Sequence, residues 1–249
     1  MMRSVGVWMN KVTTGIRGLD SMLKGGFPEA SVILISGGPG SGKTVLSAQF
    51  LYHGATRGEA GIYISLEDSP MRIIKTCSSF NWDIKKYADQ GLLTFVDASP
   101  FEGQFGEGTF LIGKDDPHAF NADTLFEILR RFCHRNIKRA VFDPITMFTS
   151  QFQDPLKRRE QVLSLTKLLH EAKLTTIFTA EIESEGSDYY TPEQYISDGV
   201  INLRYLSKDF HRLRALDILK MASHDFDRYL RPYEITSRGF EVYNTERVH

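Results

Sequence analysis

The chain has 249 residues, of which 41% are hydrophobic and 24% charged, and its formal net charge is −1 at neutral pH. This composition is ordinary for a globular protein, and the length suffices for one well-buried domain; we expect a single domain over residues 1–249, with its motifs within about residues 10–243. The near-neutral charge gives no support for nonspecific nucleic-acid binding, and no apolar run approaches the length of a membrane span.

Strands and helices alternate through the first part of the chain. An apolar run over residues 31–36 predicts a buried parallel strand, and a glycine-rich turn leads from it to a helix over residues 44–56. Residues 60–66 predict a second buried strand, and a helix over residues 71–80 leads to a third strand over residues 92–97. This order is typical of strand–helix–strand units in a parallel sheet.

The alternation continues and then changes. Residues 121–132 predict a helix, residues 139–143 and 175–181 predict a fourth and fifth strand, and Pro155 opens the helix between those two strands. After Gly199 the pattern becomes that of shorter alternating strands, which we expect over residues 200–206, 213–220 and 229–235.

Two segments, residues 99–118 and 183–195, show no regular period. The first contains glycines, acidic residues and scattered phenylalanines, and the second is polar with several acidic residues. We expect long surface loops there, and loops of this kind often carry function.

The alternation predicts an α/β fold with a mostly parallel central sheet, helices on both faces and antiparallel C-terminal strands. Sheets of this kind bind ligands at the carboxyl ends of their strands. The glycine-rich turn, Glu67, Asp143 and Glu181 all follow or end predicted strands. We therefore expect them at one edge of the sheet.

The glycine-rich turn fits the phosphate-loop pattern G-x-x-x-x-G-K-[ST]. Its glycines let backbone N–H groups converge on phosphate oxygens, and the following helix N-terminus adds donors and a partial positive charge. The sequence therefore predicts binding of a nucleoside triphosphate. The expected nucleotide-binding residues are Gly37, Gly38, Pro39, Gly40, Ser41, Gly42, Lys43, Thr44 and Val45.

Three side chains are expected at the phosphates and at a metal ion. Lys43 should reach the β- and γ-phosphates, and the Thr44 hydroxyl should complete a Mg²⁺ shell. Asp143 ends an apolar strand well after the phosphate loop, which is the place of the Walker B carboxylate. There it would hold Mg²⁺ through water.

Acidic residues supply candidates for the group that activates water. Glu67 ends the strand after the phosphate-loop helix, so it could face the γ-phosphate and act as general base. Asp68 points away from Glu67 in an extended segment, which leaves it a supporting role. Glu181 could sense the γ-phosphate or the water from a neighbouring strand end.

Five further segments carry the pattern of one family: residues 13–20 (TTGIRGLD), 23–28 (LKGGFP), 62–68 (IYISLED), 197–203 (SDGVINL) and 214–221 (RALDILKM). With these motifs around its phosphate loop, the chain resembles the KaiC-domain ATPases of the RecA/RadA superfamily over essentially its whole length. It carries one such domain, like the single-domain archaeal and bacterial members. Nothing in it indicates circadian timekeeping.

The resemblance implies a RecA-like core, ATP as the nucleotide, and a homo-oligomer, commonly a ring hexamer with ATP between subunits. It also implies that Lys220 contacts the γ-phosphate on a neighbouring subunit, where a cation stabilises charge that develops in the transition state. The family's arginine two positions later is replaced by Ala222. We expect slower hydrolysis as a result, with Arg214 helping at the interface.

Three functions remain open from the sequence. The first is a Mg²⁺-ATP-dependent oligomeric ATPase whose hydrolysis drives a regulatory or conformational cycle. The second is a RadA-related recombination accessory that binds single-stranded DNA, although the acidic loop residues Glu183, Glu185 and Asp188 would repel phosphates. The third is a nucleotide-gated interaction protein with negligible turnover, which the missing arginine suggests.

The cysteines and the first residues bear on the compartment. Cys77 and Cys133 lie far apart without metal-ligand spacing, so we expect reduced thiols. Residues 1–8 are too short and too mixed in character for a signal peptide. The sequence predicts a cytoplasmic protein with no membrane partner.

Overall fold

The central feature of the molecule is a large, mostly parallel sheet, seen in a computed structural model that describes residues 10–98, 109–111, 125–127, 129–130, 136–181, 190–208, 211–222 and 224–246. In this part of the chain the strand order is β12-β11-β10-β9-β3-β8-β7-β4-β5-β6. The strands are β3 (Val32–Gly37), β4 (Gly61–Ser65), β5 (Leu93–Asp97), β6 (Thr109–Leu111), β7 (Arg139–Asp143), β8 (Thr175–Ala180), β9 (Gly199–Lys208), β10 (His211–Met221), β11 (Arg231–Thr236) and β12 (Gly239–Val242).

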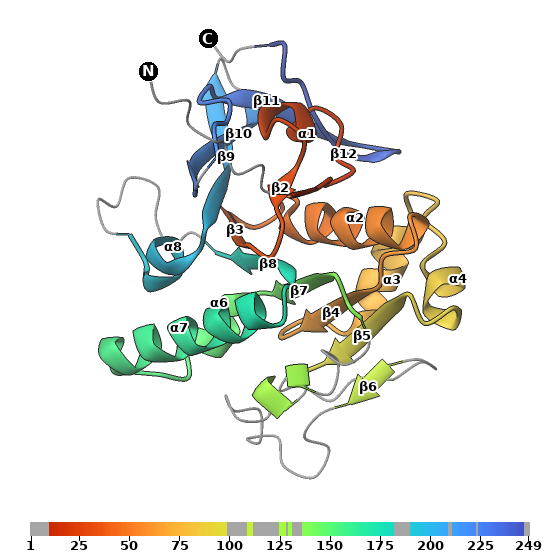
Figure 1. The fold of residues 1–249 in the computed structure, drawn as a ribbon. Helices are drawn as coiled ribbons and strands as arrows, with labels where there is room; N and C mark the ends of the chain where they lie inside the picture. Colours follow the sequence, from red (N-terminus) through yellow and green to blue (C-terminus); the bar gives the residue numbers. More distant parts are fainter. Residues whose placement is uncertain are drawn as a thin grey trace, which may run out of the picture.

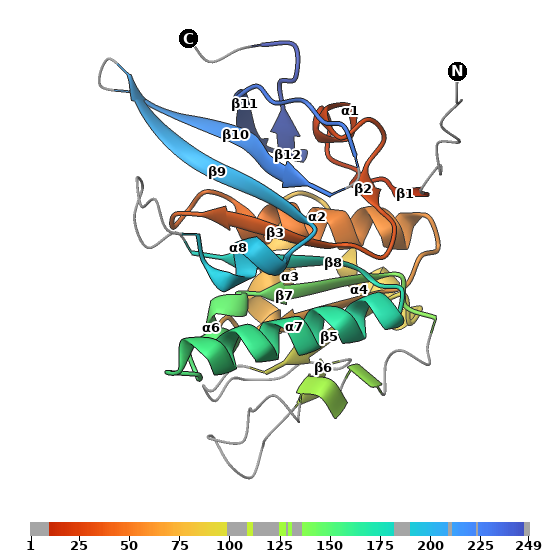
Figure 2. The ribbon, with the colours of Figure 1, turned by 60° about the vertical axis from the view of Figure 1, so that its left-hand side comes forward.

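The sheet changes from parallel to antiparallel at β9. Strands β3 to β8 and β9 itself pair in parallel, whereas β10, β11 and β12 each run antiparallel to their predecessor. Figure 2 shows β9 and β10 as a long ribbon that projects beyond the other strands. This arrangement confirms the predicted fold class.

Helices cover both faces of the parallel part (Figure 1). One buried cluster packs helix α2 against residues such as Ile33, Ile35 and Tyr63, and a second packs Leu165 of α7 against Leu34 on the opposite face. The strands β1 (Lys11–Val12) and β2 (Phe27–Pro28) form a separate two-stranded sheet that is not part of the large sheet. The helices are α1 (Leu19–Met22), α2 (Lys43–Thr56), α3 (Pro70–Ser78), α4 (Ile84–Asp89), α6 (Ile145–Thr149), α7 (Pro155–Glu171) and α8 (Pro192–Ile196).

Short elements are where the sequence prediction was wrong. The expected loop over residues 99–118 contains β6, which pairs in parallel with β5, and residues 99–108 and 112–118 lie outside the described part. The expected loop over residues 183–195 ends in α8, where the Thr191 hydroxyl accepts a hydrogen bond from the Gln194 N–H and the Gln194 side chain accepts one from the Thr191 N–H. This capping box, with Pro192 in the first turn, starts a helix too short to show an apolar period.

The helix expected over residues 121–132 is described only at residues 125–127 and 129–130, which are helical, with Leu125 and Leu129 buried. Cys77 is buried as a free thiol, whereas Cys133 lies outside the described residues. Among the helices that the structure describes, none is both long and apolar enough to cross a membrane.

Candidate active site

The phosphate loop connects β3 to α2 at the carboxyl edge of the sheet. Gly42, directly before α2, has φ +98°, a conformation that favours glycine. The Lys43 ammonium bends back over the loop and donates hydrogen bonds to the carbonyl oxygens of Gly37 (2.7 Å) and Gly38 (3.2 Å). The loop therefore has the strand–turn–helix geometry that its sequence pattern requires.

The antiparallel strands hold this loop from one side. The Tyr233 hydroxyl of β11 donates to the Ser41 carbonyl (2.7 Å), and its ring stacks on Phe240 of β12 with 4.4 Å between centroids. Burial raises the pKa of Tyr233 further above neutrality. A methyl group at Gly42 would lie 2.6 Å from Cδ1 of Ile235, so β11 contacts the loop closely.

Arg214 lies against the phosphate loop of its own chain. Its guanidinium donates a long hydrogen bond to the Gly40 carbonyl (3.5 Å) and lies over the Tyr205 ring, 5.9 Å from the centroid. Within one chain, Arg214 therefore contacts the phosphate loop itself.

Asp143 is the best-connected carboxylate of the site. It ends β7 and is only 8% exposed. Its Oδ2 accepts hydrogen bonds from the Thr44 hydroxyl (2.8 Å) and from the Tyr63 hydroxyl, and its Oδ1 accepts one from the Thr179 hydroxyl. Burial, and next the charge of Asp143, raise the pKa of Tyr63 well above its usual range. The structure thus joins the two residues predicted for Mg²⁺, Thr44 and Asp143.

Tyr63 and Thr179 were missed in the sequence. Each is a polar residue inside an apolar strand, and β4 and β8 are the two neighbours of β7 in the sheet. Predicting these contacts requires the strand order, because only that order shows that β4 and β8 flank β7 and place both hydroxyls beside Asp143. The sequence did not give this order directly.

The donor set fits a nucleotide-borne Mg²⁺. The Thr44 hydroxyl donates a hydrogen bond to Asp143, and the lone pairs of the hydroxyl oxygen remain available to a metal ion. Within the described residues, no group of three or more His, Cys, Asp or Glu side chains could hold a metal. Mg²⁺ sites of nucleotide-binding proteins commonly take few protein ligands and complete their shell with phosphates and water, and these residues suit such a site.

Glu67 and Glu181 lie on the same edge as the phosphate loop. Glu67 is exposed, but partial desolvation still raises its pKa above the ordinary value, and the negative charge of Glu181 is the next cause. Burial lowers the pKa of Lys43, which the charges of Glu181, Asp143 and Glu67 oppose. The strands that precede Glu67 and Glu181 run parallel to β7, which ends at Asp143, so these groups lie at one edge of the sheet.

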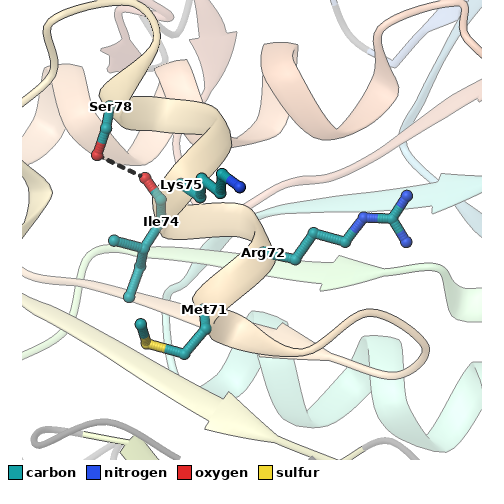
Figure 3. A pocket seen from close by; sticks show the side chains of 5 residues that line it. All are labelled: Met71, Arg72, Ile74, Lys75 and Ser78. Atoms are coloured by element: carbon teal, nitrogen blue, oxygen red, sulfur yellow. Dashed lines mark hydrogen bonds between the residues drawn. The ribbon is translucent and has the colours of Figure 1, made fainter. Parts of the chain in front are cut away.

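Asp68 turns away from this group, as its position after Glu67 predicts. Its carboxylate pairs with Arg72 of α3 (2.7 Å), one turn later. A shallow hollow on the outside of α3, lined by Met71, Arg72, Ile74, Lys75 and Ser78, is shown in Figure 3. It contains none of the predicted site residues, so the phosphate loop and not this hollow defines the site.

Lys220 is not brought to the phosphate loop within one chain. It pairs with Val200 in the β9–β10 ladder, at the level of Leu34 near the start of β3. Its ammonium donates to the carbonyl oxygens of Tyr195 (2.9 Å) and Gln194 (3.4 Å) at the end of α8. Burial lowers the pKa of Lys220, and the charge of Asp198 opposes this.

The chain is similar to known proteins in sequence and in fold. A family model described as "ATPase: KaiC" matches residues 12–247. A UPF0273 protein of Pyrococcus furiosus is 35% identical over 240 residues, covering 94% of each chain. The circadian clock oscillator protein KaiC of Prochlorococcus marinus is 34% identical over 226 residues, covering 88% of this chain and 42% of that protein.

A solved structure is also similar. The crystal structure of a KaiC-like protein from Pyrococcus horikoshii matches with a TM-score of 0.80 and 33% identity, covering 94% of this chain and 99% of that one. The matched chain is of the single-domain kind, which confirms the resemblance inferred from the motifs.

Proposed function

The chain belongs to the KaiC family of ATPases, and from this premise we propose that it binds Mg²⁺-ATP and hydrolyses it as a homo-oligomer, in a regulatory or conformational cycle. One observation carries the proposal. Thr44 and Asp143, which are 99 positions apart, meet at 2.8 Å beside a formed phosphate loop. This is the pair that a phosphate-loop ATPase needs for its metal ion.

Binding would use groups that already surround the loop. The N–H groups at the start of α2 and the positive end of its dipole face the loop, where triphosphate oxygens would lie. The Lys43 ammonium would leave the carbonyls of Gly37 and Gly38 for the more negative phosphate oxygens. Bound Mg²⁺ would neutralise phosphate charge, held by Thr44 directly and by Asp143 through water.

Hydrolysis would use Glu67 as the base. The carboxylate takes a proton from a water whose oxygen attacks the γ-phosphorus, while the bond to the β–γ bridging oxygen breaks and ADP leaves. A pKa raised towards neutrality makes Glu67 a stronger base than an ordinary carboxylate. Lys43 offsets the charge that develops on the phosphates.

A second copy of the chain would complete the site. Lys220 is partly exposed, and its ammonium would turn from α8 towards ATP bound on a neighbouring subunit, as in a ring hexamer. Ala222, whose N–H donates to the Asp198 carbonyl (2.7 Å), occupies the position of the family's arginine. Loss of such an arginine can cost about a thousandfold in rate, so we expect slow turnover.

The test is ATP hydrolysis with Mg²⁺ over a range of protein concentrations, for the wild type, Glu67→Gln and the control Glu160→Gln. Glu160 is an exposed acid of α7 outside the site. We expect the rate per subunit to rise with concentration, to fall by about 100-fold or more in Glu67→Gln, and to stay unchanged in the control.

Other outcomes identify the alternatives. Tight ATP binding without turnover at any concentration would replace the ATPase by a nucleotide-gated interaction protein. Strong stimulation by single-stranded DNA would favour the recombination accessory, with residues 99–118 and 183–195 as the candidate DNA loops. The acidic residues Glu183, Glu185 and Asp188, which argue against DNA binding, lie outside the described part.

A further inference from the structure

The Asp143 carboxylate lies at the centre of a group of hydroxyls contributed by three different elements. Strand β7 runs between β8 and β4, and Thr179 and Tyr63 extend from these neighbours, while Thr44 comes from the first turn of α2. Tyr63 is 1% exposed and Thr179 is fully buried. Three hydroxyls therefore converge on one carboxylate.

This convergence fixes how Asp143 can accept further bonds. A carboxylate has about four lone-pair positions, two on each oxygen. Thr44 and Tyr63 both donate to Oδ2, and Thr179 donates to Oδ1. Within the described residues, one position on Oδ1 remains for another donor, such as a water molecule on a metal ion.

We propose that Tyr63 and Thr179 are positioning residues that orient Asp143 towards the water shell of the Mg²⁺ carried by the nucleotide. This inference rests on the proposed function and deepens it. Partners of this outer kind fix the direction of a metal-facing carboxylate, and their loss commonly weakens metal binding by 10- to 100-fold.

A purely structural role for the two hydroxyls makes a different prediction. If they only satisfy a buried charge, their removal lowers the stability of the fold without changing how nucleotide binding responds to Mg²⁺. Tyr63→Phe separates the two roles well because the ring that stacks on Phe95, with 5.9 Å between centroids, is retained. Only the hydroxyl is lost.

The experiment measures binding of a fluorescent ATP analogue over a Mg²⁺ titration and in EDTA, with thermal melting of each protein. The variants are Tyr63→Phe, Thr179→Val and the conservative Thr179→Ser. The matched control is Thr176→Val on the same strand, a fully buried threonine whose hydroxyl donates to the Leu174 carbonyl (3.5 Å) and not to Asp143.

We expect Tyr63→Phe and Thr179→Val each to raise the Mg²⁺ concentration for half-maximal tightening about tenfold, with affinity in EDTA within about twofold of the wild type. Thr179→Ser and Thr176→Val should match the wild type. If Tyr63→Phe fails to melt cooperatively, the comparison of Thr179→Val with Thr179→Ser decides between the positioning role and the structural role.

The inference is overturned if the Mg²⁺ midpoint is unchanged in both hydroxyl deletions, or if affinity with and without Mg²⁺ falls in parallel. Those results would leave the proposed function intact, because the wild type would still respond to Mg²⁺. A wild-type protein whose nucleotide binding ignores Mg²⁺ would overturn the proposed function and this inference together.

Discussion

The two sides of the candidate site are built differently. On the side that we propose holds Mg²⁺, Asp143 is buried and accepts three hydroxyl hydrogen bonds. On the side that we propose faces the attacking water, Glu67 and Glu181 are exposed, and within the described residues neither carboxylate makes a hydrogen bond or ion pair. In the proposed mechanism, a single chain thus holds the carboxylate for metal binding in a fixed position and leaves the carboxylates for hydrolysis exposed.

The difference has a physical reason. A buried carboxylate must be surrounded by donors, because desolvation without them would be too costly, and those donors also fix its direction. A base that removes a proton from water must meet that water, and a cation from a second subunit must be able to approach. We infer that nucleotide affinity belongs to one chain, whereas turnover depends on what closes the open side.

The largest effect should come from crowding the loop itself. Gly42→Ala places a methyl group at φ +98°, 2.6 Å from Ile235, and we expect ATP affinity to fall by about 100-fold and stability by about 1–3 kcal/mol. The control is Gly58→Ala, with φ +77° and no atom within 4 Å of the added methyl group. Equal loss of ATP binding in both variants, measured by calorimetry, would contradict a specific role for the loop.

The open side should respond to the loss of Lys220. Lys220→Ala should reduce kcat about tenfold at high protein concentration, because the transition-state charge loses a cation, with little change in ATP affinity. The control is Lys167→Ala, an exposed lysine of α7. An unchanged kcat would mean that Lys220 serves only the end of α8.

The support of the loop by β11 should have a smaller effect. Tyr233→Phe removes the hydrogen bond to the Ser41 carbonyl, which is buried, and should cost about 1–2 kcal/mol of stability and a few-fold in ATP affinity. Tyr243→Phe is the control, since its hydroxyl donates to the exposed Glu234 (2.8 Å). Equal melting temperatures for the two variants would show that the hydrogen bond from Tyr233 does not stabilise the phosphate loop.

The smallest effect should be a shift in pH dependence. Glu67 must be deprotonated to act as base, so hydrolysis should rise with pH through its pKa, which lies above the ordinary 4.5. Glu181→Gln removes a negative charge that raises this pKa, so the acid limb of the pH–rate profile should move to lower pH. If the acid limb of the pH–rate profile does not move in Glu181→Gln, the charge of Glu181 does not influence the pKa of Glu67.

The sequence predicted most of the parallel sheet because each buried strand is an apolar run followed by a recognisable signal. The phosphate loop, Asp143 and Glu67 lie where those signals placed them, at one edge of the sheet. The contributions of Tyr63 and Thr179 could not be read from the sequence, because they depend on which strands flank β7. Short elements such as α8 and β6 were missed because they contain too few residues to establish a period.

The contact between the phosphate loop and β11 also bears on how the protein is made. Tyr233 and Ser41 are 192 positions apart, so the ribosome completes the loop sequence long before it supplies the strand that supports it. At 5–20 residues per second, this delay is on the order of ten seconds or more. We expect a nascent chain to capture ATP firmly only after residues 231–242 have emerged, so nucleotide retention would mark the moment when synthesis has produced a complete binding site.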